Sequence, residues 1–524
     1  MEIPAKPAER SARKEDTSRQ LSPVDAAFLY LERKEIPLAI ASVFIFDGPI
    51  PFDRFAASIE SRLHLIPRYR QVVVMPPYNL GYPTWEDDRH FDIHNHIFRV
   101  QLDAPGGEAE LEALAGRIFS QLMDRSKPLW ECYVVDGLAD GRGAVILRLH
   151  HSLVDGIAGV GLVKVLLDTT PDSADPAGVP PFRPRRRRKQ NPSLVNAFAT
   201  AVQSSVQGLM AAEAVLLDLA KSLLGDPTRV QGLVSVLPEL AASVERLPFN
   251  KPCSGDRKFC WAQFDLADVE AIRAAGGGTV NDVILTVLTR ALARYVKLHR
   301  QTVVNRFVRI VCPVNLRHGE QNGDLGNQIS FMPVALPLDV KDPMAMLKGV
   351  AARTDAMKRG HAADAVALLA NCIAATPPPV QALFWWGIPQ ITLPVPLFNM
   401  ICTNVPGSPV PLYSVGRRMI ATYPQVPTGY ELGINVAVQS YDGRLFFGLI
   451  ADAHVAPDVV RLRDFLRASF EELRRAAGVK KARKARARKP KSSTKPSTPV
   501  GAVAVSQPAG ETAPVVEIGA KAVA

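Results

Sequence analysis

Residues 143–156 read GAVILRLHHSLVDG, and this stretch brings two imidazoles and a carboxylate to one point of the chain. Its first seven residues form a short apolar run, rich in β-branched side chains and bounded by glycine, which predicts a buried strand. We expect the strand to end at His150 and His151. Asp155 can then cap a following helix, and Gly156 leaves room for another group to approach the backbone.

The two adjacent histidines suit proton transfer near neutral pH, because imidazole can take up a proton and return it in that range. Neighbouring residues at a strand end face opposite ways, so one ring should point into a cleft while the other packs behind it. The pattern does not decide which ring does which, and a satisfied core histidine is an equal interpretation on this motif alone. Asp155 is interpreted as structural, since a buried carboxylate more often pairs with an arginine.

Several further segments accompany this motif in a fixed order along most of the chain. They are residues 21–28 (LSPVDAAF), Trp85 with residues 91–92 (FD), residues 124–131 (DRSKPLWE), residues 249–250 (FN) with Arg257, residues 281–282 (ND), residues 313–317 (PVNLR) with 326–327 (GN), residues 403–407 (TNVPG), residues 440–443 (SYDG) and Asp452. Together with HHxxxDG, they make the chain resemble the bacterial wax ester synthase/diacylglycerol acyltransferases, within the superfamily of coenzyme A-dependent acyltransferases.

The resemblance implies an α/β fold of two chloramphenicol acetyltransferase-like domains that share a central channel, with the His-His motif at their interface. The sequence itself alternates helix-like residues 280–298 with strand-like residues 307–311, 331–336 and 445–450, which also indicates an α/β chain. Pro128 and Trp130 are expected to be packing residues.

The resemblance also implies the activity, which is transfer of a long-chain fatty acyl group from acyl-CoA to diacylglycerol, giving triacylglycerol, or to a fatty alcohol, giving a wax ester. The chain has no Gly-x-Ser-x-Gly motif, and the resemblance implies direct transfer through a ternary complex without an acyl-enzyme. No metal or prosthetic group is implied, and acyl-CoA is a substrate. Two alternatives stay open: an acyltransferase for another alcohol or amine acceptor, and a non-catalytic tether on lipid surfaces.

The residue roles follow from the resemblance position by position. The second motif histidine, His151, is the proposed general base, with His150, Asp155 and Gly156 completing the motif. Asn281 and Asp282 match a supporting motif, although an equal interpretation makes them a helix N-cap after three glycines. Arg317 is a candidate salt-bridge partner of Asp155, and a plain surface arginine is an equal alternative.

Composition divides the 524 residues into five parts. We expect a disordered N-terminus over residues 1–20, a first acyltransferase domain over 21–170, a Pro/Arg-rich linker with an amphipathic helix over 171–248, a second domain over 249–478, and a disordered basic tail over 479–524. The helix, within residues 193–224, is expected either to pack on its own protein or to lie on a membrane or droplet surface.

The net charge of +11 is concentrated in two short segments. Residues 480–524 carry +8 and residues 183–189 carry +6, so the rest of the chain sums to −3. No aromatic residues interleave with these basic residues, which makes nucleic acid an unlikely partner and anionic lipid a better one. A merely solubilising tail is an equal interpretation of residues 480–524.

Two further features bear on location. The first twenty residues are polar and lack the apolar core of a signal peptide, so we expect a cytoplasmic protein, peripheral on the inner face of the plasma membrane or on lipid droplets. Residues 380–402 are apolar but interrupted by three prolines, which excludes a transmembrane helix and leaves an acyl tunnel or ordinary core. The six cysteines have no C-x-x-C spacing and are expected to be free, mostly buried thiols.

Overall fold

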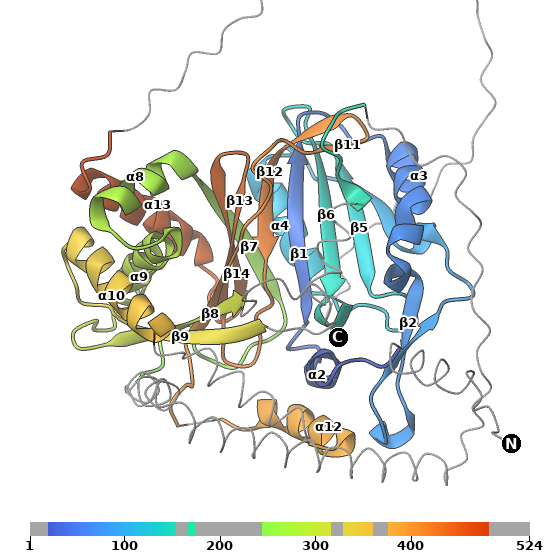
Figure 1. Ribbon diagram of the computed structural model, residues 1–524, viewed down its shortest axis with the longest axis horizontal. Coiled ribbons are helices and arrows are strands. Elements are labelled where there is room, and N and C mark those ends of the chain that lie inside the picture. Colours follow the sequence, from blue (N-terminus) through green and yellow to red (C-terminus); the bar gives the residue numbers. More distant parts are fainter. Residues whose placement is uncertain are drawn as a thin grey trace, which may run out of the picture.

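Two α/β lobes lie side by side in the computed structural model, each built on a six-stranded sheet (Figure 1). The structure describes residues 19–153, 163, 165–172, 244–315, 329–359, 376–392 and 394–480. Asp155, Gly156 and Arg317 lie outside these residues, as do the predicted linker helix of residues 193–224 and residues 481–524 of the predicted tail. Val479, the first residue assigned to the tail, packs against the core of the second lobe.

The first sheet has the order β11-β12-β1-β6-β5-β4 and contains both parallel and antiparallel pairs. Its strands are β1 (Ala39–Phe46), β4 (Ile97–Gln101), β5 (Trp130–Asp136), β6 (Gly143–His150), β11 (Tyr413–Ser414) and β12 (Arg417–Gln425). The same lobe holds α2 (Pro23–Leu31), α3 (Phe52–Arg62), α4 (Glu108–Phe119), the hairpin of β2 (Gln71–Val74) and β3 (Thr84–Asp87), and the short turns η1 (Leu63–Leu65), η2 (Pro67–Arg70), η3 (Pro77–Asn79), η4 (Ile93–Asn95) and η5 (His151–Leu153).

The second sheet has the order β7-β14-β13-β10-β8-β9, and helices cover its outer side (Figure 1). Its strands are β7 (Arg257–Asp265), β8 (Phe307–Asn315), β9 (Ile329–Pro337), β10 (Met400–Val405), β13 (Ile434–Tyr441) and β14 (Arg444–Asp452), and the helices are α8 (Leu266–Gly276), α9 (Val280–Leu298), α10 (Pro343–Arg359) and α13 (Val459–Ala476). The predicted helix over residues 280–298 and the three predicted strands of this lobe are confirmed.

The chain returns to the first lobe near its end. β12 pairs antiparallel with β1, although both β11 and β12 lie in the stretch that sequence order assigns to the second domain. β12 also contacts β13 and β14 of the second sheet. At this junction a Cβ on Gly448 would lie 1.8 Å from the Pro424 carbonyl oxygen, so only glycine permits the two sheets to approach so closely.

The two lobes share buried contacts beyond this strand exchange. Phe259 and Trp261 of β7 pack in the hydrophobic core of the first lobe. Glu112 of α4 accepts hydrogen bonds from the Trp261 amide at 3.1 Å and from Arg463 of α13 at 3.2 Å. Burial raises the pKa of Glu112 to about 7, against the pull of Arg463. The lobes therefore associate through core packing as well as polar contacts.

The expected boundaries need correction at two places. Gln20 forms a bridge with Thr84, and the Trp85 amide donates to the Arg19 carbonyl, so residues 19 and 20 belong to the first lobe. Val244 and Leu247 are buried, and Leu247 packs in the core of the second lobe, so that lobe includes residues assigned to the linker. In both cases local composition missed backbone or apolar contacts with distant segments.

The apolar residues 380–402 do not form a single buried element. They include most of α12 (Pro378–Gly387), the turn η6 (Ile388–Gln390) and the start of β10. Met400 and Cys402 are buried, but Leu383, Trp386 and Leu397 are exposed, so ordinary core is the wrong interpretation for this part. Across the described residues, no helix combines the length and apolar character needed to cross a membrane.

Candidate active site

The His-His motif stands at the end of the central strand of the first sheet. All eight residues of β6 are buried, as predicted from the apolar run, and the strand lies between β1 and β5. His150 pairs with Ala39 of β1 in register, and the chain then turns into η5 at His151. One histidine is fully buried and the other half-buried, as the alternation at a strand end predicts.

His150 is the ring that packs behind. It has no solvent exposure, and its Nδ1 accepts a hydrogen bond from the Ser152 amide at 3.1 Å, with the Ser152 hydroxyl 2.6 Å away. Because a backbone amide can only donate, the neutral ring carries its proton on Nε2. That nitrogen lies 3.3 Å from Oε2 of Glu32, so its proton faces a carboxylate that attracts it electrostatically.

Glu32 is a site residue that the sequence analysis missed. It follows α2 as the helix C-cap, and its carboxylate accepts hydrogen bonds from the Leu38 amide at 3.0 Å and from Arg125 at 3.0 Å. Burial alone would raise its pKa, but His150, the Leu38 amide and Arg125 outweigh burial and lower the pKa to about 2. The one sequence feature that could have pointed to Glu32 is its position just after the motif at residues 21–28. No spacing rule links Glu32 to His150, so the sequence did not predict their contact.

His151 is the less buried of the two residues. It stacks on Phe28 of α2 with ring centroids 3.8 Å apart, and its amide donates to the Leu38 carbonyl at 2.9 Å. Nδ1 is sealed from solvent without a hydrogen-bond partner among the described residues, which leaves Nε2 as the candidate nitrogen for proton transfer. Burial is the main reason that the pKa of His151 falls to about 4, and the neighbouring His150 lowers it further.

Asn281 and Asp282 lie at the start of α9 in the second lobe. Asp282 belongs to a capping box: its carboxylate accepts hydrogen bonds from the Thr279 amide at 2.7 Å and hydroxyl at 2.8 Å, and Thr354 of α10 donates to its other oxygen. No hydrogen bond joins either residue to His151 within the described chain. The helix-cap interpretation therefore accounts for the contacts of Asp282.

A buried ion pair ties the second lobe to the loop that carries Glu32. Arg257 of β7 donates to Asp452 of β14 at 2.9 Å, and both side chains are almost fully buried. The same guanidinium donates to the Glu35 carbonyl at 3.2 Å, three residues after Glu32. Arg257 and Asp452 belong to the motifs quoted above but had no predicted role. The structure assigns them to holding this loop against the second lobe.

Replacing Glu32 with glutamine is expected to destabilise the protein by about 2–3 kcal/mol at neutral pH, since the folded carboxylate has a lowered pKa. Such a group stabilises the fold above its unfolded pKa of about 4.5, and this contribution is lost as the pH falls through about 2. Urea denaturation at several pH values measures the difference. A gap between wild type and variant that widens toward acid pH would contradict the assignment.

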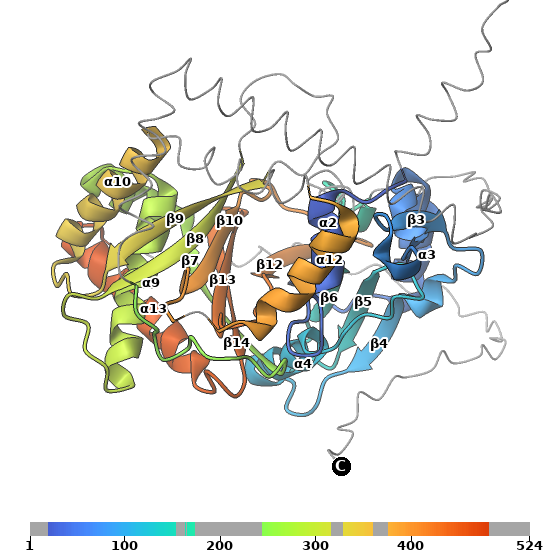
Figure 2. The same ribbon diagram turned by 90° about the horizontal axis from the view of Figure 1, so that it is seen from below.

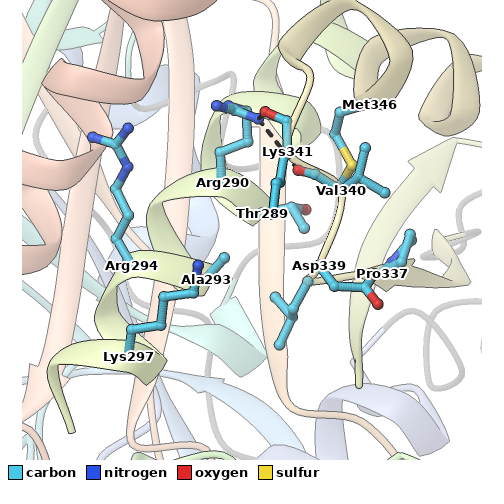
Figure 3. Close-up of a pocket in the computed structure, with 11 residues that line it drawn as sticks. Thr289, Arg290, Ala293, Arg294, Lys297, Pro337, Asp339, Val340, Lys341 and Met346 are labelled. Carbon is cyan, nitrogen blue, oxygen red and sulfur yellow. Dashed lines mark hydrogen bonds between the residues drawn. The ribbon is translucent and has the colours of Figure 1, made fainter. Parts of the chain in front are cut away.

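A separate hollow of about 190 Å³ lies on the second lobe between α9 and the connection from β9 to α10 (Figure 3). Four basic residues line it, but Arg290 donates to the Lys341 carbonyl at 2.9 Å, and Arg290 and Arg294 both pair with Glu472. The lining contains none of the predicted site residues. It is not the candidate active site.

Comparisons with known proteins bear on the whole chain. The family model of the wax ester synthase/diacylglycerol acyltransferase catalytic domain matches residues 21–284, and the model of the WS/DGAT C-terminal domain matches residues 325–474. A probable diacylglycerol O-acyltransferase of Mycobacterium tuberculosis, tgs1, is 30% identical over 446 residues, which cover 84% of this chain and 93% of the relative.

Two solved structures share the fold. The wax ester synthase/diacylglycerol acyltransferase of Marinobacter aquaeolei VT8 matches with a TM-score of 0.60 and 24% identity, covering 88% of this chain and all of that one. The starter condensation domain of the rhizomide synthetase RzmA, in complex with C8-CoA, matches with a TM-score of 0.52 and 13% identity, over 89% of this chain and 96% of that one. The predicted fold of two chloramphenicol acetyltransferase-like domains is confirmed. With both family models matched in order, the chain belongs to the wax ester synthase/diacylglycerol acyltransferase family.

Proposed function

We propose that this protein transfers a long-chain fatty acyl group from acyl-CoA to the hydroxyl of diacylglycerol or of a fatty alcohol, with His151 as the general base. The observation that carries the proposal is the position of His151 at the end of β6, stacked on Phe28 with only one ring nitrogen able to act. Family membership and the names of the relatives support the reaction class.

The chemistry requires one proton acceptor. Nε2 of His151 takes the proton of the acceptor hydroxyl as that oxygen forms a bond to the thioester carbonyl carbon. The carbon–sulfur bond then breaks, and the imidazolium returns the proton to the departing CoA thiolate. Atoms and charge balance without a covalent acyl-enzyme, and no metal or prosthetic group takes part in the proposed route.

The surrounding residues have positioning roles in this scheme. The carboxylate of Glu32, held by Arg125, fixes the ring of His150 at the strand end. His150 and its bonds to Ser152 in turn fix the turn that carries His151. Asp155 as a local structural residue, paired with Arg317, remains part of the proposal, as do supporting roles for Gly156, Asn281 and Asp282.

The lowered pKa of His151 predicts a specific pH dependence of kcat/KM. A base with a pKa of about 4 is already neutral at physiological pH, so we expect kcat/KM to stay level from about pH 8 to about pH 5 and to fall only near pH 4. Initial rates of CoA release across this range measure the profile. A midpoint near 6.5, the ordinary value for histidine, would contradict the buried environment described for this ring.

We also propose peripheral contact with a membrane or lipid droplet, because diacylglycerol, fatty alcohols and both products are poorly soluble in water. The basic residues 183–189 and 480–524 are candidates for contact with anionic lipid.

The deciding experiment measures CoA release from palmitoyl-CoA with dioleoylglycerol or hexadecanol as acceptor, and resolves the lipid product by chromatography. Acceptor-dependent release supports the proposal, and the product distinguishes triacylglycerol from wax ester. Folded protein that releases no CoA with either acceptor would overturn it, in favour of another alcohol or amine acceptor or a non-catalytic lipid tether.

A further inference from the structure

The outward face of α12 is apolar where a helix in water would be polar. Val380, Leu383 and Trp386 are more than half exposed, whereas Gln381 is buried. The Gln381 side chain donates to the Tyr82 hydroxyl at 2.6 Å and to the Thr376 carbonyl at 2.8 Å. The helix therefore satisfies its polar residue inside the protein and presents its large apolar residues outward, the reverse of an ordinary surface helix.

The apolar exposure continues beyond the helix. We define the α12 surface by the exposed side chains of this segment and of the neighbouring η3, which contacts α12. Its members are Val380, Leu383, Phe384, Trp386, Ile391, Val395 and Leu397, with Tyr78 of η3. Single exposed apolar residues are common on soluble proteins, but eight gathered on two adjoining segments indicate a binding surface.

The two segments that form the α12 surface carry no charged residues of their own. No Asp, Glu, Lys or Arg occurs in residues 365–416, and none occurs in residues 75–85. A protein partner would be expected to meet a polar or charged rim, while the acyl region of a lipid layer offers no charge to pair. Trp386 and Tyr78 are of the kind that favours the boundary between headgroups and acyl chains.

The α12 surface is connected to His151 through one helix. α12 packs against α2, and the two are side by side in both views (Figures 1 and 2). α2 contacts η5 and carries Phe28, whose ring stacks on His151. Arg33, in the loop after α2, donates to the Trp386 carbonyl at 2.9 Å and fixes the end of α12 there. A lipid layer on α12 would thus lie on the side of the molecule where the candidate base is held.

We propose that the α12 surface docks this protein on a zwitterionic phospholipid surface, independently of the basic segments. The reason for docking, which is access to water-insoluble acceptors, rests on the proposed function. The docking itself is inferred from the exposed apolar residues alone. Because the residues that form the surface are uncharged and Arg33 is the charged side chain described at its edge, docking depends chiefly on apolar burial and only weakly on salt.

The test uses the full chain, phosphatidylcholine vesicles and a double variant, Leu383→Glu with Trp386→Glu. The matched control is Leu298→Glu with Val460→Glu, which adds the same charge at two apolar positions exposed on α9 and α13. We expect the double variant to bind vesicles at least about tenfold more weakly, since two large side chains leave the acyl region. Wild type and control should bind alike, also in about 0.5 M sodium chloride.

Activity separates docking from catalysis. The double variant should release CoA at the wild-type rate with hexanol, a dissolved acceptor, but about tenfold more slowly with dioleoylglycerol in vesicles. A separate variant, Ile391→Glu, changes an exposed residue outside the helix. It should also weaken vesicle binding and slow the reaction with dioleoylglycerol, and it serves as the test if the double variant fails to fold. If wild type released no CoA with any acceptor but bound vesicles through these residues, the proposed function would fail and the docking surface would stand.

Three outcomes would overturn the inference. Vesicle binding by the double variant as tight as that of wild type would exclude the α12 surface. Binding of wild type only to anionic vesicles, and its loss in salt, would assign docking to the basic segments instead. An equal loss in the Leu298→Glu, Val460→Glu control would mean that added charge alone weakens binding.

Discussion

Replacing His151 with alanine is expected to lower the rate of acyl transfer by about 10²–10⁴-fold, the usual contribution of a positioned general base. The reason is that Nε2 of this ring is the proposed proton acceptor, while His150 is enclosed by Ser152 and Glu32 and has no access to a substrate. CoA release from palmitoyl-CoA with hexadecanol measures the effect, at a protein concentration corrected for folded fraction.

The controls separate chemistry from packing. His151→Gln keeps a side chain over Phe28 without supplying an imidazole, so it should be as inactive as His151→Ala while melting closer to wild type. His94→Ala removes an exposed imidazole of the same lobe and should leave the rate unchanged. Acceptor-dependent CoA release in His151→Ala within about tenfold of wild type would reject His151 as the base.

Asp452→Ala is expected to destabilise the protein by about 3–5 kcal/mol, because it leaves the buried guanidinium of Arg257 without its counter-charge. The carboxylate also accepts hydrogen bonds from the amides of Ser254, Gly255 and Val455. These bonds outweigh burial and lower the pKa of Asp452, so the carboxylate is charged at neutral pH. The free energy of unfolding from urea denaturation measures the loss.

Asp256→Ala is the matched control for this prediction. Asp256 adjoins Arg257 in sequence, but its side chain is exposed and forms an ion pair with His454 at 3.7 Å. An exposed pair of this kind contributes little, so the control should unfold like wild type. Asp452→Ala should in addition reduce acyl transfer, because Arg257 holds the Glu35 carbonyl in the loop that carries Glu32. An unfolding free energy within about 1 kcal/mol of wild type would contradict the buried ion pair.

Local patterns anticipated much of the fold. The apolar run before His150 became the fully buried strand β6, and the pattern over residues 280–298 became α9 with the same ends. Such patterns work because strand and helix periodicity, glycine breaks and caps act within a few residues of one another. They also indicated that one motif histidine would be buried and the other accessible.

Contacts between distant segments could not be read in this way. Glu32 meets His150 because β1 and β6 pair in one register, and the Leu38 carbonyl and amide then reach His151 and Glu32. β12 joins the first sheet from the far end of the chain, although its own sequence resembles any strand of the second domain. Each arrangement depends on the free energy of contacts between segments that are far apart in the sequence. Local composition does not reveal which of these segments will meet.

The sequence by itself determined the family, the α/β class and the identity of the candidate base, since these rest on an ordered set of motifs and on short-range periodicity. Only the tertiary structure decided which histidine is enclosed, that Glu32 stands behind it, and that α12 turns Gln381 inward and Trp386 outward. The physical reason is that burial is a property of the packed whole: a side chain's environment, and with it its pKa and its exposure, is set by whatever segment folds against it.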